Sequence, residues 1–388
     1  MTVSLSDLDF LTSDAGARLL AQLAHEDLSD ASMLRQLTRL RRDHTPAHAG
    51  AALTLARLRS KGVEKFGADA ARMFFTADAL EQASDPLIRH WRHRWIASMD
   101  TSIVDACCGI GADLLAFASG GAQVTGVEID PVRAQMARLN VAALGQRADV
   151  LCADVREGLP DAQLAFFDPA RRADGRRLHH VEAYQPPLSV VRTWPHPQIA
   201  VKLSPGVDLA ELAEYGGDVV FVSVYGDLKE AVLRLTGTGK RTALLLHEDA
   251  AWMLNAPDVD LDAVIDAPRS WLCEPDAAAI RAGLVRTLAA QANGALLDET
   301  IAYFTTAIQP NSPWLRAWQI ETWMPFSVKR LREYLRERNV GSVTVKKRGT
   351  AVTPEILIPQ LKLKGDHERV IVLTRLRGQQ IAIVCTDG

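Results

Sequence analysis

At 388 residues the chain is long enough for two or three domains, and 48% hydrophobic with 23% charged residues is ordinary for a globular protein. The first ten residues, MTVSLSDLDF, lack the basic start and the apolar run of a secretory signal. No stretch approaches the roughly 18 consecutive apolar residues that a membrane span requires. We therefore expect a cytoplasmic protein that no membrane segment anchors.

The charge is spread unevenly along the chain. The formal net charge is −3, yet residues 326–377 hold thirteen Lys or Arg against five acids, a local net charge of +8. The remainder of the chain therefore carries about −11. Such asymmetry favours a polyanionic partner at the C-terminal end.

The five cysteines indicate reduced thiols and no disulfide framework. They form no CxxC pair, and the neighbours Cys107 and Cys108 would have to strain to bond to each other. No His or Cys follows at metal-ligand spacing, so we expect no metal site.

The predicted elements change character along the chain. Residues 1–97 are predicted to be helical, because LARLRSKGVEKF and PLIRHWRHRWIASM space their apolar residues three and four apart. From Ser102 short apolar runs alternate with amphipathic helices, which predicts parallel strands in a doubly wound, Rossmann-like α/β sheet. After about residue 247 the pattern loosens, with one helix expected from Asp276 to Ala292. Beyond Asn311 the pattern predicts a small α+β module. The expected domains are 1–97, 98–247 and 248–388.

The first strand-to-helix turn of the α/β region reads VDACCGIGAD, from Val104 to Asp113. Its glycines, Gly109 and Gly111, let the backbone bend and approach a ligand closely. A metal, a dinucleotide or another adenosine-bearing ligand could occupy such a turn. The dinucleotide pattern G-x-G-x-x-G requires a third glycine where this chain has Leu114, which weakens the pyrophosphate alternative.

Three further acids stand at the ends of the next predicted strands. Glu128 ends the second strand, where a carboxylate can accept hydrogen bonds from the hydroxyls of an adenosine ribose. Asp154 follows the third strand and can hold an adenine amino group. Asp168 follows the fourth, in FFDPARR. Ligands of open α/β sheets bind at this edge, so the four strand ends together predict one pocket.

These motifs resemble class I S-adenosylmethionine-dependent methyltransferases, whose sheet has seven strands, and the cysteine before Gly-x-Gly is similar to RNA-modifying members such as the trimethylguanosine synthases. The flanking sequences resemble a bacterial methyltransferase family with a THUMP-like C-terminal domain. The resemblance implies S-adenosylmethionine as cofactor, with Asp168 beside the transferring methyl. With this cofactor we predict a cofactor-binding set of Asp105, Cys107, Gly109, Gly111, Glu128, Ile129, Asp154 and Val155, and a catalytic set of Asp168, Pro169 and Arg171.

The fourth strand end departs from the pattern of these relatives. Enzymes that methylate exocyclic amines commonly read (D/N/S)PP(Y/F/W) there, and the aromatic residue stacks on the target base. This chain reads Asp168-Pro169-Ala170-Arg171, so the aromatic clamp is missing and a guanidinium stands next to its place. For an amine acceptor, Asp168 and the backbone carbonyls after it would accept the N–H groups. Asp168→Asn is then expected to be milder than Asp168→Ala.

Basic clusters favour RNA as the acceptor. We predict contacts from Arg171, Arg172 and Arg176, and from Lys346, Lys347 and Arg348, near which the sequence places no acid. Basic and aromatic residues also interleave from Arg89 to Trp95, which suits RNA contact or a helix face in the core. The sequence thus predicts methylation of a nucleobase in tRNA or rRNA. A small-molecule methyltransferase and an RNA-binding protein without turnover are the alternatives, and the oligomeric state is open.

Overall fold

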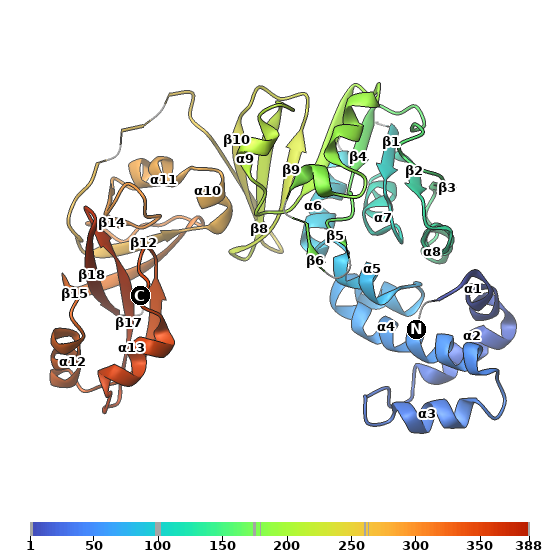
Figure 1. Ribbon diagram of the computed structural model, residues 1–388, viewed down its shortest axis with the longest axis horizontal. Helices are drawn as coiled ribbons and strands as arrows, with labels where there is room; N and C mark the ends of the chain where they lie inside the picture. Colours follow the sequence, from blue (N-terminus) through green and yellow to red (C-terminus); the bar gives the residue numbers. More distant parts are fainter. Residues whose placement is uncertain are drawn as a thin grey trace. The chain divides into compact units, whose positions relative to one another are not determined.

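The computed structural model describes residues 3–97, 102–173, 176–178, 180–259, 261–262 and 264–386, with the backbone alone for 95–97, 172–173 and 176–177. The chain divides into two compact units (Figure 1). Unit 1 comprises Met1–Asp218 and Glu230–Thr238, and unit 2 comprises Val219–Lys229 and Gly239–Gly388.

Unit 1 begins with helices that pack around the long helix α4 (Figure 1). Serine and threonine side chains cap the N-termini of α1, α2, α4 and α5 by accepting backbone N–H groups, as Ser4 does from Asp7. Leucines at helical spacing, such as Leu19 and Leu23, are buried between the helices. The helices are α1 (Leu5–Thr12), α2 (Asp14–Leu23), α3 (Met33–Leu40), α4 (Pro46–Phe66), α5 (Ala77–Gln82) and α6 (Pro86–Ala97).

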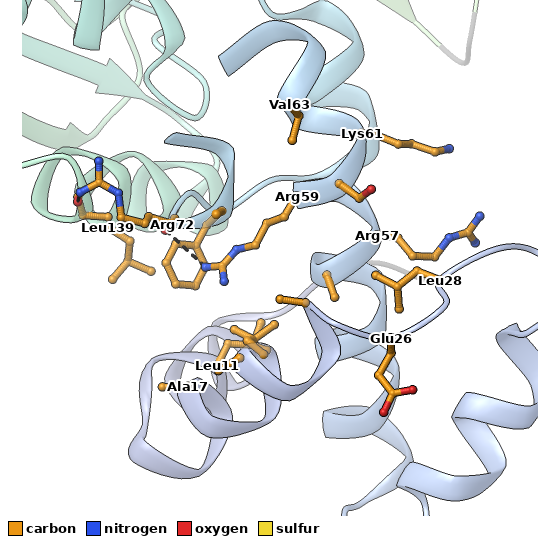
Figure 2. Close-up of a pocket in the computed structure, with 18 of the residues that line it drawn as sticks. Leu11, Ala17, Glu26, Leu28, Arg57, Arg59, Lys61, Val63, Arg72 and Leu139 are labelled. Atoms are coloured by element: carbon orange, nitrogen blue, oxygen red, sulfur yellow. Dashed lines mark hydrogen bonds between the residues drawn. The ribbon is translucent and has the colours of Figure 1, made fainter. Parts of the chain in front are cut away.

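A groove of about 1340 Å³ lies among these helices, and Figure 2 shows Arg59 reaching from α4 across it. Arg59 Nε donates to the carbonyl of Met73 at 2.9 Å, and the guanidinium lies 5.3 Å from the ring centre of Phe74. Burial lowers the pKa of Arg59 to about 10. Arg59 therefore ties α4 to the segment before α5, which is a structural role.

The sheet of unit 1 has the strand order β9-β7-β4-β1-β2-β3. The strands β1, β2, β3, β4 and β7 run parallel, so their carboxyl ends share one edge, and β9 runs antiparallel to β7. Asp130 caps the N-terminus of helix α8, whose first residue is Pro131. The elements are β1 (Ser102–Ala106), α7 (Ala112–Ser119), β2 (Gln123–Glu128), α8 (Pro131–Ala143), β3 (Asp149–Cys152), β4 (Leu164–Phe167), β7 (Gln198–Leu203), α9 (Leu209–Leu212) and β9 (Asp227–Arg234).

Asn140 of α8 joins the helical region to the glycine turn. Its Oδ1 accepts the N–H of Phe74 at 2.6 Å, and its Nδ2 donates to the carbonyls of Phe74 at 3.1 Å and Ile110 at 2.9 Å. Asn140 is fully buried. A buried amide whose hydrogen bonds are made fixes the groups around it. The N-terminal helices therefore hold the turn that the sequence predicts to bind the cofactor.

Unit 2 contains two groups of strands. β10 pairs with β8 in parallel and with β11 in antiparallel orientation, and a second sheet has the order β13-β14-β12-β15-β18-β17-β16. Helices α12 and α13 lie beside this second sheet (Figure 1), and their Leu331 and Leu357 share a buried core with it. The elements are β8 (Asp218–Val224), β10 (Arg241–Leu246), β11 (Ala251–Asn255), β12 (Trp271–Pro275), α10 (Ala277–Arg281), α11 (Val285–Gln291), β13 (Ala295–Leu296), β14 (Phe304–Thr306), β15 (Leu315–Pro325), α12 (Val328–Glu337), β16 (Val340–Lys347), α13 (Pro354–Leu361), β17 (His367–Leu376) and β18 (Gln379–Thr386).

The Rossmann-like α/β class predicted from the alternation of elements is confirmed. Six strands of the expected seven lie in the unit 1 sheet, and β8 pairs with β10 in unit 2. The single helix expected over 276–292 is wrong. Gly283, at φ +76°, interrupts it between α10 and α11, because this left-handed conformation ends a helix.

Candidate active site

Four charged side chains meet at the carboxyl edge of the unit 1 sheet. Asp105 lies in β1, Glu128 ends β2, Asp168 directly follows β4, and Lys202 is the last residue but one of β7. The backbone N–H of Asp168 donates to the carbonyl of Ala106 at 3.2 Å, which sets the fourth strand end beside the first. The parallel register of the strands thus brings together residues far apart in the sequence.

The glycine turn adopts left-handed conformations at three positions. Gly109 and Gly111 have φ of +58° and +87°, and Cys107 has φ of +65°. Glycine takes this conformation freely, whereas it strains a residue with a Cβ atom. Cys107 therefore occupies a position where the backbone favours glycine. A Cβ atom on Gly109 would meet no atom within 4 Å, so this turn leaves room beside it for a ligand.

Glu128 holds the glycine turn from the neighbouring strand. Its Oε2 accepts the N–H of Gly109 and its Oε1 accepts the N–H of Asp130, both at 2.9 Å. The residue is buried, and each carboxylate oxygen keeps a further acceptor site. Ile129, which follows, is 59% exposed and presents an apolar surface next to the acid.

At the third strand end the acid pairs with an exposed arginine two residues along the chain. Asp154 accepts three hydrogen bonds from the Arg156 side chain, at 2.9 and 3.0 Å from Nε and at 2.5 Å from Nη2, and this bonding lowers the pKa of Asp154. Val155 is buried, and its carbonyl accepts the indole N–H of Trp194 at 3.2 Å. A ligand amino group at Asp154 would share the carboxylate with Arg156.

Asp105 is buried without a full set of hydrogen-bond partners. Among the described residues no group within hydrogen-bonding distance donates to its Oδ2. Burial raises the pKa of Asp105 well above its usual range, and the carboxylates of Asp113 and Asp168 raise it further. An orphaned buried carboxyl beside a glycine turn suits a ligand with a cationic group, since that partner would satisfy both the oxygen and the charge.

Asp105→Asn is expected to stabilise the free protein and to weaken cofactor binding. The folded-state pKa of Asp105 is raised. Its contribution to stability is therefore fully present below the pKa of the unfolded carboxyl, and it is lost as the pH rises through the folded-state pKa. At pH 7 the amide avoids this loss, and Tm should rise by about 3 °C. Affinity for S-adenosylhomocysteine should fall about tenfold, because an amide carries no charge for an ammonium group. Differential scanning calorimetry and titration calorimetry measure both effects, and a lower Tm at pH 7 would contradict this account.

A buried ion cluster, here called the α6 cluster, connects helix α6 with the residues around Asp168. It consists of Arg92, Asp113, Glu230, Lys202 and Ser84. Arg92 of α6 pairs with both Asp113 of α7 and Glu230 of β9. Burial alone would raise the pKa of Asp113, but Arg92 and Lys202 lower it to about 2. All members are nearly inaccessible to solvent, and buried charges persist only when paired in this way.

The sequence interpretation missed this cluster. The visible signal for Lys202 is a lysine inside the otherwise apolar run QIAVKL, because a charge in a buried strand needs a partner. For the run from Arg89 to Trp95, the sequence leaves RNA contact and a helix face in the core as alternatives. At Arg92 the second alternative holds, because this residue is buried and pairs with Asp113 and Glu230.

The segment after Asp168 folds back on itself. Ala170 exchanges both backbone hydrogen bonds with Gln185, at 2.9 and 3.0 Å, so its carbonyl already has a donor. Arg171 Nη2 lies 3.8 Å from Oδ1 of Asp168. The short strands β5 (Arg172–Ala173) and β6 (Arg176–Arg177) pair in the antiparallel sense. The side chains of Arg172 and Arg176, which the sequence assigns to the substrate, lie outside the described residues.

The expectation that no acid lies near Lys346, Lys347 and Arg348 is wrong. Glu274, 72 residues before Lys346, accepts hydrogen bonds from Lys346 at 2.6 Å and Arg348 at 3.2 Å. Glu274 lies in β12 and Lys346 in β16 of the same sheet, so the fold brings this acid close and the local sequence does not reveal it. Lys347 alone of the three is exposed without such a bond.

Comparison with known proteins identifies the family. A family described as a methyltransferase domain matches residues 103–184, one described as THUMP domain-like matches 315–387, and one described as a domain of unknown function matches 4–62. The Mycobacterium tuberculosis proteins Rv3037c (strain H37Rv) and MT3122 (strain CDC 1551) are each 35% identical over 310 residues, covering 78% of this chain and 84% of theirs. Both are named uncharacterized S-adenosylmethionine-dependent methyltransferases. The chain belongs to the S-adenosylmethionine-dependent methyltransferases.

The fold of this methyltransferase is shared with a solved structure. A crystal structure of a Porphyromonas gingivalis W83 protein described as a methyltransferase matches 100% of both chains with a TM-score of 0.80 at 21% identity. At this identity the likeness concerns the fold.

The methyltransferase uses S-adenosylmethionine, as the sequence predicts. The residues fit this cofactor, because its amino acid part carries an ammonium group for the orphaned oxygen of Asp105 and its ribose hydroxyls can donate to Glu128. The contribution of each predicted cofactor residue stays a prediction. Within the described ranges, no group of three or more His, Cys, Asp or Glu could hold a metal ion. No helix in that part of the chain is long and apolar enough to cross a membrane.

Proposed function

We propose that this methyltransferase methylates a nucleobase, at an exocyclic amine or a ring nitrogen, in tRNA or rRNA. The observation that carries the proposal is an uncompensated basic surface on its THUMP-like region. Five exposed cations there have no ion pair or side-chain hydrogen bond within the described residues: Lys329, Arg330, Arg336, Lys362 and Lys364. We call this set the α12 surface.

The α12 surface is built by the packing of two helices. Leu331 and Leu335 of α12 turn inward and share a core with Leu357 and Leu361 of α13. The cations on α12 are therefore left on its solvent side, and Lys362 and Lys364 directly follow α13. Glu333 and Glu337 also lie on α12, but the five cations leave this surface with a net positive charge. Gathered like charges cost free energy, which a polyanion such as the RNA backbone would recover.

At the carboxyl edge of the sheet, the protein has to position the acceptor base next to the methyl group of the cofactor. The cofactor, when bound, supplies a sulfonium methyl that is already a strong electrophile. Asp168 accepts an N–H of the acceptor base and directs the nitrogen lone pair, and the nitrogen loses its proton to solvent after the transfer. The carbonyl of Pro169 can assist, whereas that of Ala170 is shared with Gln185. Arg171 supplies a planar cation for a base or a phosphate.

The direct test supplies labelled S-adenosylmethionine and total RNA from a strain that lacks the gene. After digestion, mass spectrometry of the nucleosides should find label in one modified base. Label confined to small molecules would overturn the RNA proposal and favour a small-molecule methyltransferase.

Binding of bulk tRNA should depend steeply on salt because of the α12 surface. Replacing its five cations by alanine should lower the affinity at 100 mM salt about 30-fold and reduce the slope of log K against log salt by about 4, since each phosphate contact contributes roughly 0.7 to 0.9. Fluorescence anisotropy across a salt series measures both. The matched control changes Lys346 and Arg348, which Glu274 neutralises, and should alter the slope by less than about 1. An unchanged slope in the α12 variant would remove the basis of the proposal.

A further inference from the structure

Lys202 is a buried lysine whose bonds converge on Asp168. Its side chain is only 4% exposed, and Nζ donates to Oδ2 of Asp168 at 2.7 Å and to Oγ of Ser84 at 2.9 Å. Oδ2 of Asp113 lies 3.8 Å from the same nitrogen. Ser84 donates its own hydroxyl to Asp113 at 2.7 Å, so its oxygen is free to accept from Lys202. The lysine is thus fixed on three sides.

The surroundings keep Lys202 in its ammonium form. Burial alone lowers the pKa of Lys202, but the carboxylates of Asp168, Asp113 and Glu230 more than offset this, and the pKa is raised. Lys202 therefore acts as a permanent donor near neutral pH and cannot serve as a base.

The two oxygens of Asp168 are consequently unequal. Oδ2 is committed to Lys202, whereas within the described residues Oδ1 has only the contact with Arg171 at 3.8 Å. We infer that Lys202 is a positioning residue for methyl transfer: it takes Oδ2 of Asp168 and leaves Oδ1 as the atom that accepts the N–H of the substrate. This inference rests on the proposed role of Asp168.

The arrangement also assigns a role to the segment between α5 and α6. Ser84, which is buried, accepts a second hydrogen bond from the ammonium of Lys202. Arg92 neutralises Asp113, so that Lys202 is not drawn from Asp168 to the second carboxylate. The helical region therefore contributes to the geometry of the transfer site from outside the matched methyltransferase domain at 103–184.

A cycle of four proteins tests the inference: the wild type, Lys202→Met, Asp168→Asn and the double variant. In Asp168→Asn the single amide oxygen should bind the ammonium of Lys202, so the NH₂ group faces the substrate and opposes its N–H donor. In the double variant the amide oxygen is released. We expect turnover to fall about 30-fold in Lys202→Met and about 300-fold in Asp168→Asn, and to recover about tenfold in the double variant.

The assay measures S-adenosylhomocysteine formed in extract from a strain that lacks the gene, with heat-inactivated enzyme as background. This extract contains every natural acceptor, so turnover can be compared whatever the acceptor is. RNase treatment separates the two proposals. Turnover that survives RNase overturns the RNA proposal, whereas wild-type turnover in Lys202→Met, or no recovery in the double variant, overturns the role of Lys202.

Two further measurements exclude a merely structural effect. The Kd for S-adenosylhomocysteine should change less than about threefold in Lys202→Met, and the urea midpoints of the four proteins should be non-additive, because Lys202 and Asp168 form one pair. Arg59→Met is the matched control: Arg59 is a half-buried cation that bonds to backbone carbonyls, so its loss should lower the urea midpoint without lowering turnover. If Lys202→Met does not fold, Ser84→Ala decides: about fivefold lower turnover supports the inference, and unchanged turnover overturns it.

Discussion

Asp168→Ala is expected to lower kcat about 1000-fold, and Asp168→Asn by nearly as much. The alanine variant removes the acceptor for the substrate N–H and also leaves the ammonium of Lys202 buried without its closest partner. From the sequence alone the asparagine variant is expected to be milder, because an amide oxygen still accepts. The structure changes this expectation, since Lys202 competes for that one oxygen.

Single-turnover kinetics with a defined RNA acceptor would check the Asp168 prediction, because they isolate the transfer step from product release. Asp161→Asn is the matched control: Asp161 is exposed in the loop before β4 and should leave kcat unchanged. An Asp168→Asn variant within about threefold of the wild type would show that neither a carboxylate nor its pairing with Lys202 matters for transfer.

Glu128→Ala is expected to weaken binding of S-adenosylhomocysteine at least about 100-fold, and Glu128→Gln nearly as much. The two carboxylate oxygens each accept a backbone N–H, from Gly109 and Asp130. A glutamine must turn its NH₂ group toward one of these donors, which sets two donors against each other and opens the glycine turn. A loss of about 2.7 kcal/mol corresponds to this change in Kd.

Titration calorimetry would measure the Glu128 effect, with Glu157→Gln as the control because Glu157 is an exposed acid after β3. If Glu128→Gln binds like the wild type while Glu128→Ala does not, the residue holds the ribose alone and does not shape the turn. Comparing the Kd of both variants with that of the wild type therefore separates two roles of Glu128, binding the ribose and holding the glycine turn.

The alternation of short apolar runs and helices predicts the α/β sheet well, because crossover connections leave few topologies. The same pattern places Asp105, Glu128 and Asp168 at one edge, since parallel strands align their carboxyl ends. The strand β9 is absent from that prediction. Its sequence, DLKEAVLR, spaces apolar residues as a helix does, and the neighbouring strand β7 determines its conformation instead.

Long-range ion pairs account for most of what the sequence does not reveal about the site. Glu230 lies on the unpredicted strand, and its partner Arg92 stands 138 residues earlier. Glu274 similarly neutralises a cationic run 72 residues away. Local spacing carries no record of such pairs, because they depend on which strands and helices become neighbours. The left-handed φ of Cys107, by contrast, follows from its position in the glycine turn.

The α6 cluster has a consequence for how this protein can be divided or recombined. A cut in the stretch between α6 and β1 would remove Arg92 and Ser84. Glu230 would then lose its arginine, Asp113 would lose both Arg92 and Ser84, and Lys202 would lose its bond to Ser84. Asn140 would lose Phe74 in the same cut. Exchange of the helical region between relatives therefore requires both halves of the cluster to change together. The N-terminal helices and the unit 1 sheet should therefore change together in evolution. The exposed side of α12 has no buried ion partners among the described residues, so its residues can change one at a time.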